Sequence, residues 1–235
     1  MFPLRKHARN LASVLYRKRL TVFDRLNANV EFNAFARDAT SEANCFPDRV
    51  SLYRWLSDYL RDEPIDFLEF GVADGASIKV WCSLNSHPGS RFFGFDTFEG
   101  LPEDWTSAKP KGTFSNNGKA PEIADARVTF VKGLFQSTLY PFLDHFIPRG
   151  RLVVHIDCDL YSGALFCLSV LNQVMKPGSL LLFDEFYDLQ NEFAAFKDYV
   201  RSFYREAVLL GYTGDPGAAP IIGQAAFKLG GTTRR

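Results

Sequence analysis

The first residues whose types and spacing could do chemistry form a glycine-containing turn. Glu69 closes an apolar run, Gly71 and Gly75 follow it, and Ser77 stands where a helix is expected to begin. Glycine lets the backbone turn sharply and pass close to a ligand, while free N–H groups at a helix start can hold a carboxylate. An acceptor facing such donors suits an amino-acid zwitterion. The spacing differs from the G-x-G-x-x-G motif of dinucleotide binding, and a turn without a ligand is the alternative.

Asp96 is the second chemical feature, because it closes the next apolar run, 25 positions after Gly71. A carboxylate at the end of that strand can accept hydrogen bonds from both hydroxyls of a ribose. A turn or helix-capping aspartate is the alternative. The order of strand, glycine turn, helix, strand and acid favours a nucleoside ligand.

Four carboxylates at two later strand ends form the third feature. Asp157 and Asp159 follow one apolar run, and Asp184 and Glu185 follow the next. Strand ends of a parallel sheet share one edge, where converging carboxylates repel one another unless a cation or proton intervenes. Hard oxygen ligands select Mg²⁺ over zinc, and such an ion lowers the pKa of a bound hydroxyl. Helix capping without a metal is the alternative. His155 is interpreted first as a core histidine and second as a group near the substrate.

The elements that must position these residues are predicted to form a doubly wound α/β sheet. Seven apolar runs are strand candidates: Ile65–Phe70, Arg91–Asp96, Arg127–Val131, Leu152–Asp157, Ser179–Asp184, Ala207–Leu210 and Ile221–Leu229. Helix-length patterns lie between several of them, at 75–86, 138–146, 160–175 and 190–204. The first five runs are almost continuously apolar, as in strands covered on both faces, and the alternation favours a mostly parallel sheet. Turn residues at 211–217 predict that the last two runs form an antiparallel pair at the sheet edge.

Two segments lie outside this alternation. Residues 1–62 are interpreted as an N-terminal helical extension, with a helix opened by Pro47-Asp48, and residues 63–235 as the sheet domain. Residues 97–126 lack clear periodicity and leave the carboxyl end of a strand, where open α/β sheets bind ligands. We expect a lid loop that covers the substrate, and disorder is the alternative.

Composition and charge exclude several classes of function. The 235 residues are 46% apolar and 15% aromatic, which excludes a disordered chain. Basic and acidic residues number 27 each, so bulk charge gives no reason to expect nucleic-acid binding. The four cysteines form no C-x-x-C pair and fit reduced thiols in a cytoplasmic protein. No apolar run reaches the roughly 18–20 residues of a membrane span, and the start lacks the apolar region of a secretory signal.

The first 25 residues carry most of the charge asymmetry. Seven bases and one acid give residues 1–25 a net charge of +6, which leaves 20 bases against 26 acids, or −6, for the remainder. Residues 4–20 place apolar side chains at helical spacing opposite a basic face. We expect this helix to pack on the domain or on a second subunit, as in a homodimer. Contact with an acidic partner or a membrane surface is the alternative.

Five segments, in the same order, resemble those of class I S-adenosylmethionine-dependent methyltransferases, and more narrowly the macrocin O-methyltransferase-like group. They are LEFGVADGASI (68–78), FFGFDTFEGLPEDW (92–105), VTFVKGLFQSTL (128–139), VVHIDCDLYSGAL (153–165) and KPGSLLLFDEFY (176–187). The resemblance spans about residues 65–205 and implies a Rossmann-like seven-stranded sheet with an antiparallel last strand. It also implies Mg²⁺-assisted methyl transfer from S-adenosylmethionine to a hydroxyl of a small molecule, a sugar or another natural-product acceptor.

The resemblance further implies roles for residues of this chain. The cofactor residues would be Glu69, Gly71, Ala73, Gly75 and Ser77 at the methionine part, Asp96, Thr97 and Phe98 at the ribose, and Gly133, Phe135 and Gln136 near the adenine. The metal ligands would be Asp157, Asp184 and Glu185.

The sequence departs from the family pattern at the metal and at the base. The acidic pair is Asp184-Glu185, where two aspartates or Asp-Asn are usual, and Cys158 stands where glycine is frequent. Leu160 occupies the place of the lysine base of catechol-type relatives. The candidates for the base are, in order, Asp157 acting with the metal, Asp159 and His155.

Three other functions stay open from the sequence. A nicotinamide-dependent Rossmann oxidoreductase would share the sheet, although the missing G-x-G-x-x-G motif counts against it. A metal-independent methyltransferase would use the same fold, with carboxylates that merely cap helices. A non-catalytic protein would keep the fold as a binding module, and the intact carboxylate set argues against that.

Overall fold

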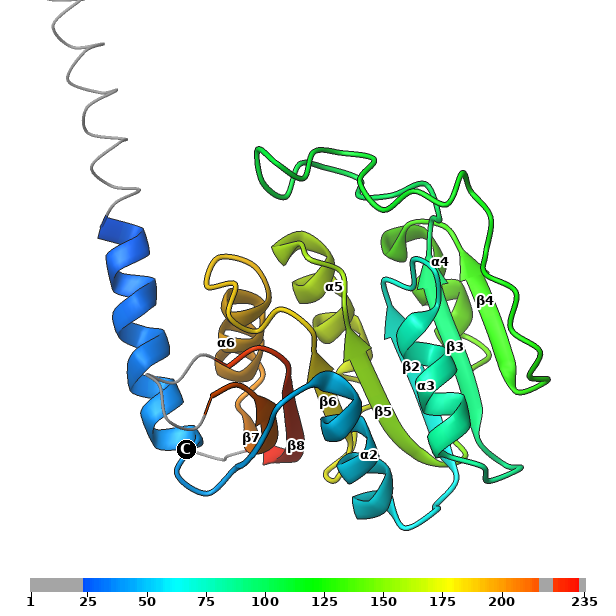
Figure 1. Ribbon diagram of the computed structural model, residues 1–235, viewed down its shortest axis with the longest axis horizontal. Coiled ribbons are helices and arrows are strands. Elements are labelled where there is room, and N and C mark those ends of the chain that lie inside the picture. Colours follow the sequence, from blue (N-terminus) through cyan, green and yellow to red (C-terminus); the bar gives the residue numbers. More distant parts are fainter. Residues whose placement is uncertain (1–22, 216–221, 233–235) are drawn as a thin grey trace, which may run out of the picture.

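One mixed β-sheet runs through the computed structural model, which describes residues 23–215 and 222–232 (Figure 1). Its strand order is β1-β7-β8-β6-β5-β2-β3-β4. The strands are β1 (Asn44–Phe46), β2 (Ile65–Phe70), β3 (Arg91–Asp96), β4 (Val128–Lys132), β5 (Arg151–Ile156), β6 (Leu180–Phe183), β7 (Arg205–Thr213) and β8 (Ala225–Thr232). The helix expected over residues 4–20 lies outside the described residues.

Strand direction matches the expected fold class. Within the described part of the chain, β8 alone runs antiparallel to its neighbours, β6 and β7. The doubly wound, mostly parallel sheet with an antiparallel last strand is therefore confirmed. The strand count differs, since seven strands were expected and eight are described, because β1 pairs in parallel with the outer side of β7. The β7–β8 pair was predicted at the edge of the sheet, but β1 is the edge strand and β7 is the second.

Helices cover both faces of the sheet (Figure 1). They are α2 (Arg49–Leu60), α3 (Ala76–Leu84), α4 (Phe135–Leu143), α5 (Tyr161–Leu171) and α6 (Glu192–Ser202), together with a helix over residues 23–39. α2 and α3 pack on one face of the sheet. α4, α5 and α6 pack on the other face, together with Phe32 and Ala36 from the helix over residues 23–39.

Alternate residues of the central strands belong to these two cores. In β2, Phe67 packs in the core under α2 and α3, whereas Leu68 and Phe70 pack in the core under α4, α5 and α6. In β5, Val153 and Val154 divide in the same way. Successive strand residues point to opposite faces, so a strand buried on both faces must be apolar nearly throughout. This burial explains why the runs are mostly apolar.

Part of the expected N-terminal extension is built into the sheet and its helix layer. β1 pairs with β7, and α2 buries Leu52, Leu56 and Leu60. Asp48 opens α2 as expected, because its side chain accepts a hydrogen bond from the Ser51 backbone N–H at 2.8 Å. Within the described residues, no helix has both the length and the apolar character needed to cross a bilayer.

The segment of residues 97–126 runs from β3 to β4 above the carboxyl ends of the strands (Figure 1). Its two arms are joined by the Leu101 N–H, which donates to the Thr113 carbonyl at 2.9 Å. Its outer part reaches the loop between β6 and α6, where Trp105 Nε1 donates a hydrogen bond to Asp188 Oδ2 at 2.7 Å. These bonds give the segment a defined path over the strand ends.

Candidate active site

The carboxyl ends of five neighbouring strands surround a cavity of about 270 Å³. Gly71 follows β2, Asp96 ends β3, Gly133 follows β4, Asp157 follows β5 and Asp184 follows β6. These strands are parallel, so their ends meet at one edge of the sheet, as the sequence predicts. The predicted site residues in the cavity wall are Gly71, Ala73, Ser77, Asp96, Thr97, Gly133, Phe135, Gln136, Asp157, Asp159, Asp184 and Glu185.

Four other predicted site residues lie outside the cavity wall. Gly75 is the N-cap of α3, and a Cβ atom added to it would lie 2.9 Å from Cγ of Pro121. Phe98 is buried and packs edge-on against Phe130, with ring centroids 5.8 Å apart. The remaining two are Glu69 and His155.

Gly71 brings the turn after β2 against the end of β5. Its φ of +92° is in the left-handed region, and a Cβ atom there would lie 1.8 Å from the Asp157 carbonyl oxygen. The Gly71 N–H donates to the Phe95 carbonyl at 3.0 Å, which also ties the turn to β3. Glycine is therefore required by both the backbone conformation and the close approach. The turn thus packs against the end of β5 while Gly71 lines the cavity.

Asp96 holds this turn in place through its carboxylate. Oδ2 accepts hydrogen bonds from the backbone N–H groups of Val72 at 2.8 Å and Ala73 at 2.9 Å. Oδ1 accepts from the Phe98 N–H at 2.7 Å. Ala73 has φ +47°, an unfavourable conformation for alanine that these bonds sustain. A carboxylate has about four acceptor positions, so Asp96 keeps capacity for a ligand hydroxyl in the cavity.

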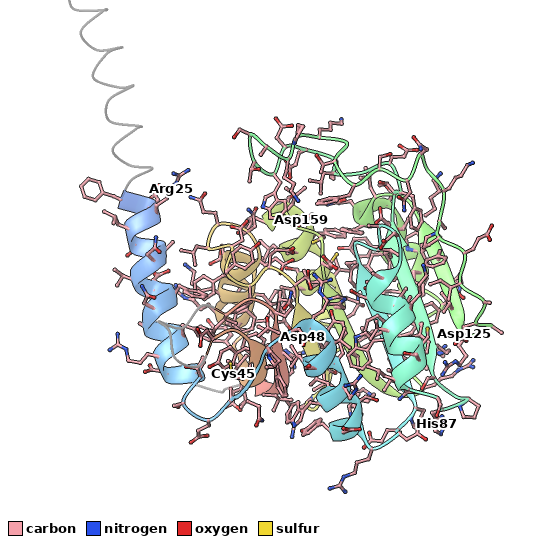
Figure 2. All side chains as sticks on the ribbon, in the orientation of Figure 1. Arg25, Cys45, Asp48, His87, Asp125 and Asp159 are labelled. Atoms are coloured by element: carbon pink, nitrogen blue, oxygen red, sulfur yellow. The ribbon has the colours of Figure 1, made fainter. Side chains whose placement is uncertain are left out.

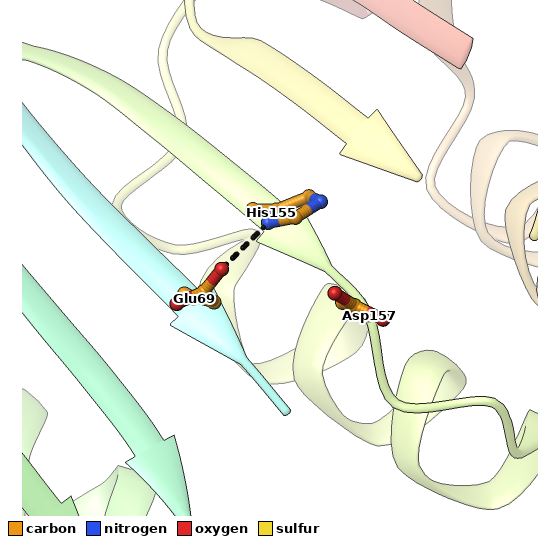
Figure 3. A group of neighbouring side chains, drawn as sticks. All are labelled: Glu69, His155 and Asp157. Carbon is orange, nitrogen blue, oxygen red and sulfur yellow. Dashed lines mark hydrogen bonds and ion pairs between the residues drawn. The ribbon is translucent and has the colours of Figure 1, made fainter. Parts of the chain in front are cut away.

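Glu69 and His155 form a buried pair behind the cavity wall, beside Asp157 (Figure 3). Glu69 Oε1 lies 3.0 Å from His155 Nδ1, and His155 Nε2 lies 3.2 Å from the Tyr53 hydroxyl. Burial lowers the pKa of His155 to about 4, so the imidazole is neutral. Burial and the charge of Asp184 raise the pKa of Glu69 well above its ordinary value. His155 is thus a partnered core histidine, the first of its two interpretations.

Asp157, Asp184 and Glu185 converge as the sequence predicts. Ligand oxygens of the three carboxylates all lie within 4.8 Å of one another. Burial and the neighbouring Asp184 raise the pKa of Asp157 well above its ordinary value and that of Glu185 to about 8. Among the residues that the structure describes, buried Glu185 Oε2 has no hydrogen-bond partner. Three converging oxygen donors with one orphaned oxygen fit a hard divalent cation such as Mg²⁺.

Asp159 lies at the start of α5, beneath the segment of residues 97–126 (Figure 2). It has φ +60°, a conformation that aspartate tolerates better than most residues. Burial raises the pKa of its carboxyl to about 6, although the charge of Lys109 acts in the opposite direction. The carboxylate is therefore mostly ionised at neutral pH and stands in the cavity wall.

Arg49 is a functional candidate that the sequence did not reveal. It is the first residue of α2 and lines the cavity. Its Nη2 atom lies 2.8 Å from Oδ2 of Asp184, which is 135 positions away in the sequence. Nothing in the sequence around Arg49 indicates a contact with Asp184. The sequence does show Asp48 as a helix cap, which places Arg49 at the first position of α2.

Glu192 is a second such residue, on the first turn of α6. It is fully buried, and its Oε2 atom accepts a hydrogen bond from the Glu185 backbone N–H at 3.0 Å. Its Oε1 atom has no hydrogen-bond partner within residues 23–215 and 222–232. Burial and the charge of Glu185 raise the pKa of its carboxyl well above the ordinary value. Glu192 thus braces the backbone that carries a predicted metal ligand.

The segment of residues 97–126 supplies apolar groups to the same cavity. Leu101, Pro102 and Phe114 line it. The side-chain amide of Asn116 donates to the Ala73 carbonyl at 2.6 Å and so joins the segment to the glycine turn. The cavity therefore has strand ends on one side and this segment on the other.

Known proteins match this chain over the part that builds the cavity. A sequence model described as a methyltransferase domain matches residues 68–186, about half of the chain. The chain belongs to this methyltransferase family. The matched part of the methyltransferase contains the glycine turn, Asp96 and the carboxylates of Asp157, Asp184 and Glu185. The resemblance to class I methyltransferases is therefore confirmed.

A curated relative of the methyltransferase comes from Streptomyces olivaceus. It is the 8-demethyl-8-(2,3-dimethoxy-alpha-L-rhamnosyl)-tetracenomycin-C 4'-O-methyltransferase, 28% identical over 144 residues. The match covers 52% of this chain and 53% of that protein. The methyltransferase therefore matches about half the length of this relative.

Solved structures of other methyltransferases share the fold. The O-methyltransferase NovP superposes with a TM-score of 0.59 at 18% identity, over 79% of this chain and 80% of that chain. CalS11, a calicheamicin methyltransferase, gives a TM-score of 0.57 at 21% identity, over 77% and 80%. The structure of cmcI with Mg and SAM gives 0.51 at 13% identity, over 77% and 72%. At such identities the likeness is one of fold, and it supports the Rossmann-like architecture.

Proposed function

We propose that this methyltransferase transfers a methyl group from S-adenosylmethionine to a hydroxyl of a small molecule, a sugar or another natural-product acceptor, with a divalent cation such as Mg²⁺. One observation carries the proposal. A single cavity is lined both by the glycine turn with Asp96 and by the carboxylates of Asp157, Asp184 and Glu185. A donor pocket and a hard-cation site thus share one space.

The residues on the turn side fit an adenosyl donor. Gly71 and Ala73 line the cavity on this side, and Asp96, which accepts three backbone hydrogen bonds, keeps one acceptor position for a ribose hydroxyl. Gly133, Phe135 and Gln136 follow β4 and line the same cavity, and the adenine base is proposed to lie against them. S-adenosylmethionine supplies an electrophilic methyl group on a sulfonium. This chain must hold the acceptor oxygen in line with that methyl group, and such positioning can contribute about 7–11 kcal/mol at its upper end.

The acid side of the cavity would hold the cation and receive the proton. Asp157, Asp184 and Glu185 would be the ligands, and the cation would supply positive charge that favours the ionised hydroxyl. Asp157 is the proposed base, and Asp159 is the reserve, since both carboxylates line the cavity. Each can take the acceptor proton on a carboxylate oxygen. His155 is the weakest candidate, because it lies outside the wall with both ring nitrogens engaged.

The segment of residues 97–126 is proposed to act as a lid. Leu101, Pro102 and Phe114 give its inner side an apolar character that excludes water from the methyl donor. The sugar-type acceptor rests on the relative from Streptomyces olivaceus, which acts on a rhamnosyl-tetracenomycin. Since that match spans about half of each protein, the acceptor class belongs to the proposal.

A homodimer through the N-terminal helices stays a prediction. The helix over residues 23–39 exposes Phe23, Leu26 and Val30 at helical spacing, which supports contact with a second copy. Sedimentation velocity of the full chain tests it, and a purely monomeric species at micromolar concentration would contradict it.

Methyl transfer by the full-length protein tests the proposed function. Purified protein with methyl-labelled S-adenosylmethionine is offered a panel of glycosides and phenols, with Mg²⁺ or with EDTA. We expect transfer to at least one hydroxyl acceptor, loss of transfer in EDTA, and recovery on adding Mg²⁺. Glu185→Ala, which removes the ligand oxygens, should lower the rate at least about 100-fold, whereas Glu42→Ala, at an exposed position, should leave it unchanged.

Three results would favour the rival functions. Thermal stabilisation by NAD but not by S-adenosylhomocysteine would favour an oxidoreductase. Transfer that survives EDTA and the Asp184→Asn substitution would favour a metal-independent methyltransferase. Calorimetry that detects no binding of any adenosyl ligand would favour a non-catalytic binding module.

A further inference from the structure

Arg49 is the sole basic side chain that lines the cavity within the described residues. The acidic side chains in the same wall are Asp74, Asp96, Asp157, Asp159, Asp184 and Glu185. One cation therefore stands among six carboxyl groups. The position of the Arg49 guanidinium therefore determines which of the six carboxylates has a positive charge beside it when no metal is bound.

The contact of Arg49 is directed at Asp184. Nη2 of Arg49 lies 2.8 Å from Oδ2 of Asp184, and Nε2 of Gln224 donates to Oδ1 of Asp184 at 3.3 Å. The Asp184 side chain is 3% exposed, whereas that of Arg49 is 42% exposed. A buried carboxylate without a counter-charge is costly. Arg49 supplies this charge from the solvent side of the cavity.

The guanidinium is attached to a rigid element. Arg49 begins α2, whose start is fixed by Asp48, with the Ser51 N–H donating to Oδ1 at 2.8 Å and the Ser51 hydroxyl donating to Oδ2 at 2.9 Å. Residues Leu52 and Leu56 of the same helix are buried in the core. The arginine side chain is thus a flexible tether on a fixed base, able to reach Asp184 or to turn back towards solvent.

We infer that Arg49 is a tethered counter-ion that competes with a divalent cation for Asp184. The inference rests on the proposed function, in which Asp184 is one of three cation ligands. Two cations at one carboxylate repel each other, so the guanidinium must withdraw or the cation binds more weakly. Withdrawal is easy for a side chain that is already partly hydrated. Arg49 therefore stabilises the metal-free cluster and sets the cation concentration at which the protein loads.

The test measures cation binding without any methyl donor or acceptor. Mn²⁺ is titrated into the full-length protein, free Mn²⁺ is read by electron paramagnetic resonance, and the melting temperature of the metal-free protein is recorded. Arg49→Gln should lower the Kd for Mn²⁺ about tenfold and should lower the melting temperature of the metal-free protein. Arg49→Lys, which keeps the charge on a shorter reach, should give intermediate values for both.

Arg54→Gln is the matched control, because Arg54 is an exposed arginine of the same helix. It removes the same charge and should leave both readouts near those of the unchanged protein. Binding to Arg49→Gln that is equal to or weaker than normal would overturn the inference while leaving the proposed function intact. Absence of Mn²⁺ binding in every variant would overturn the inference together with the metal in the proposed function. Binding that emerges only after removing Arg49 would support the inference strongly.

Discussion

A Cβ atom on Gly71 would lie 1.8 Å from the carbonyl oxygen of Asp157. The turn after β2 thus packs directly on the backbone that carries the first carboxylate after β5. The Asp157 N–H donates to the Phe70 carbonyl at 2.9 Å and closes the same junction. The donor side and the acid side of the cavity are therefore joined by backbone contact. Neither side can shift without moving a central strand.

Gly71→Ala should destabilise the fold by at least about 3 kcal/mol, because the added methyl overlaps the Asp157 carbonyl and φ is +92°. Gly112→Ala is the matched control. Gly112 has φ +87° but nothing within 4 Å of its Cβ position, so it should cost about 1–2 kcal/mol. Urea unfolding of both variants measures the difference. Equal destabilisation would show that the contact with Asp157 carries no energy.

Asp96→Asn should raise the Kd for S-adenosylhomocysteine about 10- to 100-fold, since charge-assisted hydrogen bonds contribute about 1.5–3 kcal/mol. The carboxylate also holds the N–H groups of Val72 and Ala73, so the turn should loosen. Calorimetry measures the affinity. Asp62→Asn, at an exposed position, is the control and should bind normally. An Asp96→Asn variant with unchanged affinity would remove Asp96 from the cofactor site.

Glu192→Leu should destabilise the protein by about 1 kcal/mol, because it leaves the partly buried Glu185 N–H without its acceptor. It should also weaken Mn²⁺ binding by displacing Glu185. Glu192→Gln keeps a carbonyl oxygen at this place and should retain most of the stability. Thermal unfolding and Mn²⁺ titration test both variants. If the two variants behaved alike, the hydrogen bond to Glu185 would not be what Glu192 provides.

Cysteine alkylation at pH 8 should modify Cys45 and spare the other three in the folded protein. Burial raises the pKa of Cys82 to about 12 and those of Cys158 and Cys167 well above the ordinary value. At a pKa of about 12, roughly one Cys82 thiol in ten thousand is ionised at pH 8. Cys45 is partly exposed on β1 (Figure 2). Mass spectrometry identifies the modified residue, with urea-unfolded protein as the control. Rapid labelling of Cys158 or Cys167 would contradict the described burial.

The sequence predicted the central strands well, because most of their residues are apolar and buried or half-buried. The limits expected for β2 and β3, Ile65–Phe70 and Arg91–Asp96, are those of the structure. β1 was missed, because three residues at a sheet edge show neither a period nor a continuous apolar run. α4 begins at Phe135 rather than near residue 138, because its N-cap, Leu134, forms no side-chain cap that would mark the start.

Some residues of the candidate site could be predicted from the sequence, and others could not. Asp96, Asp157 and Asp184 could be predicted because parallel topology brings the ends of their strands to one edge. Arg49 could not, because its contact with Asp184 joins residues 135 positions apart. Glu192 is only seven positions after Glu185, but the turn that brings its side chain back to the Glu185 N–H has no sequence pattern that marks it. The role of Glu69 at the cofactor stays a prediction: its Oε1 atom contacts His155, and its buried Oε2 atom has no hydrogen-bond partner among the described residues.

A crystal structure of the full-length protein soaked with S-adenosylhomocysteine and Mg²⁺ would show whether the donor and the cation share one cavity. We expect the ribose on Asp96, the base beside Phe135, and the cation among Asp157, Asp184 and Glu185. A ligand bound elsewhere, or a cation bound by other residues while these three stay unoccupied, would contradict this expectation.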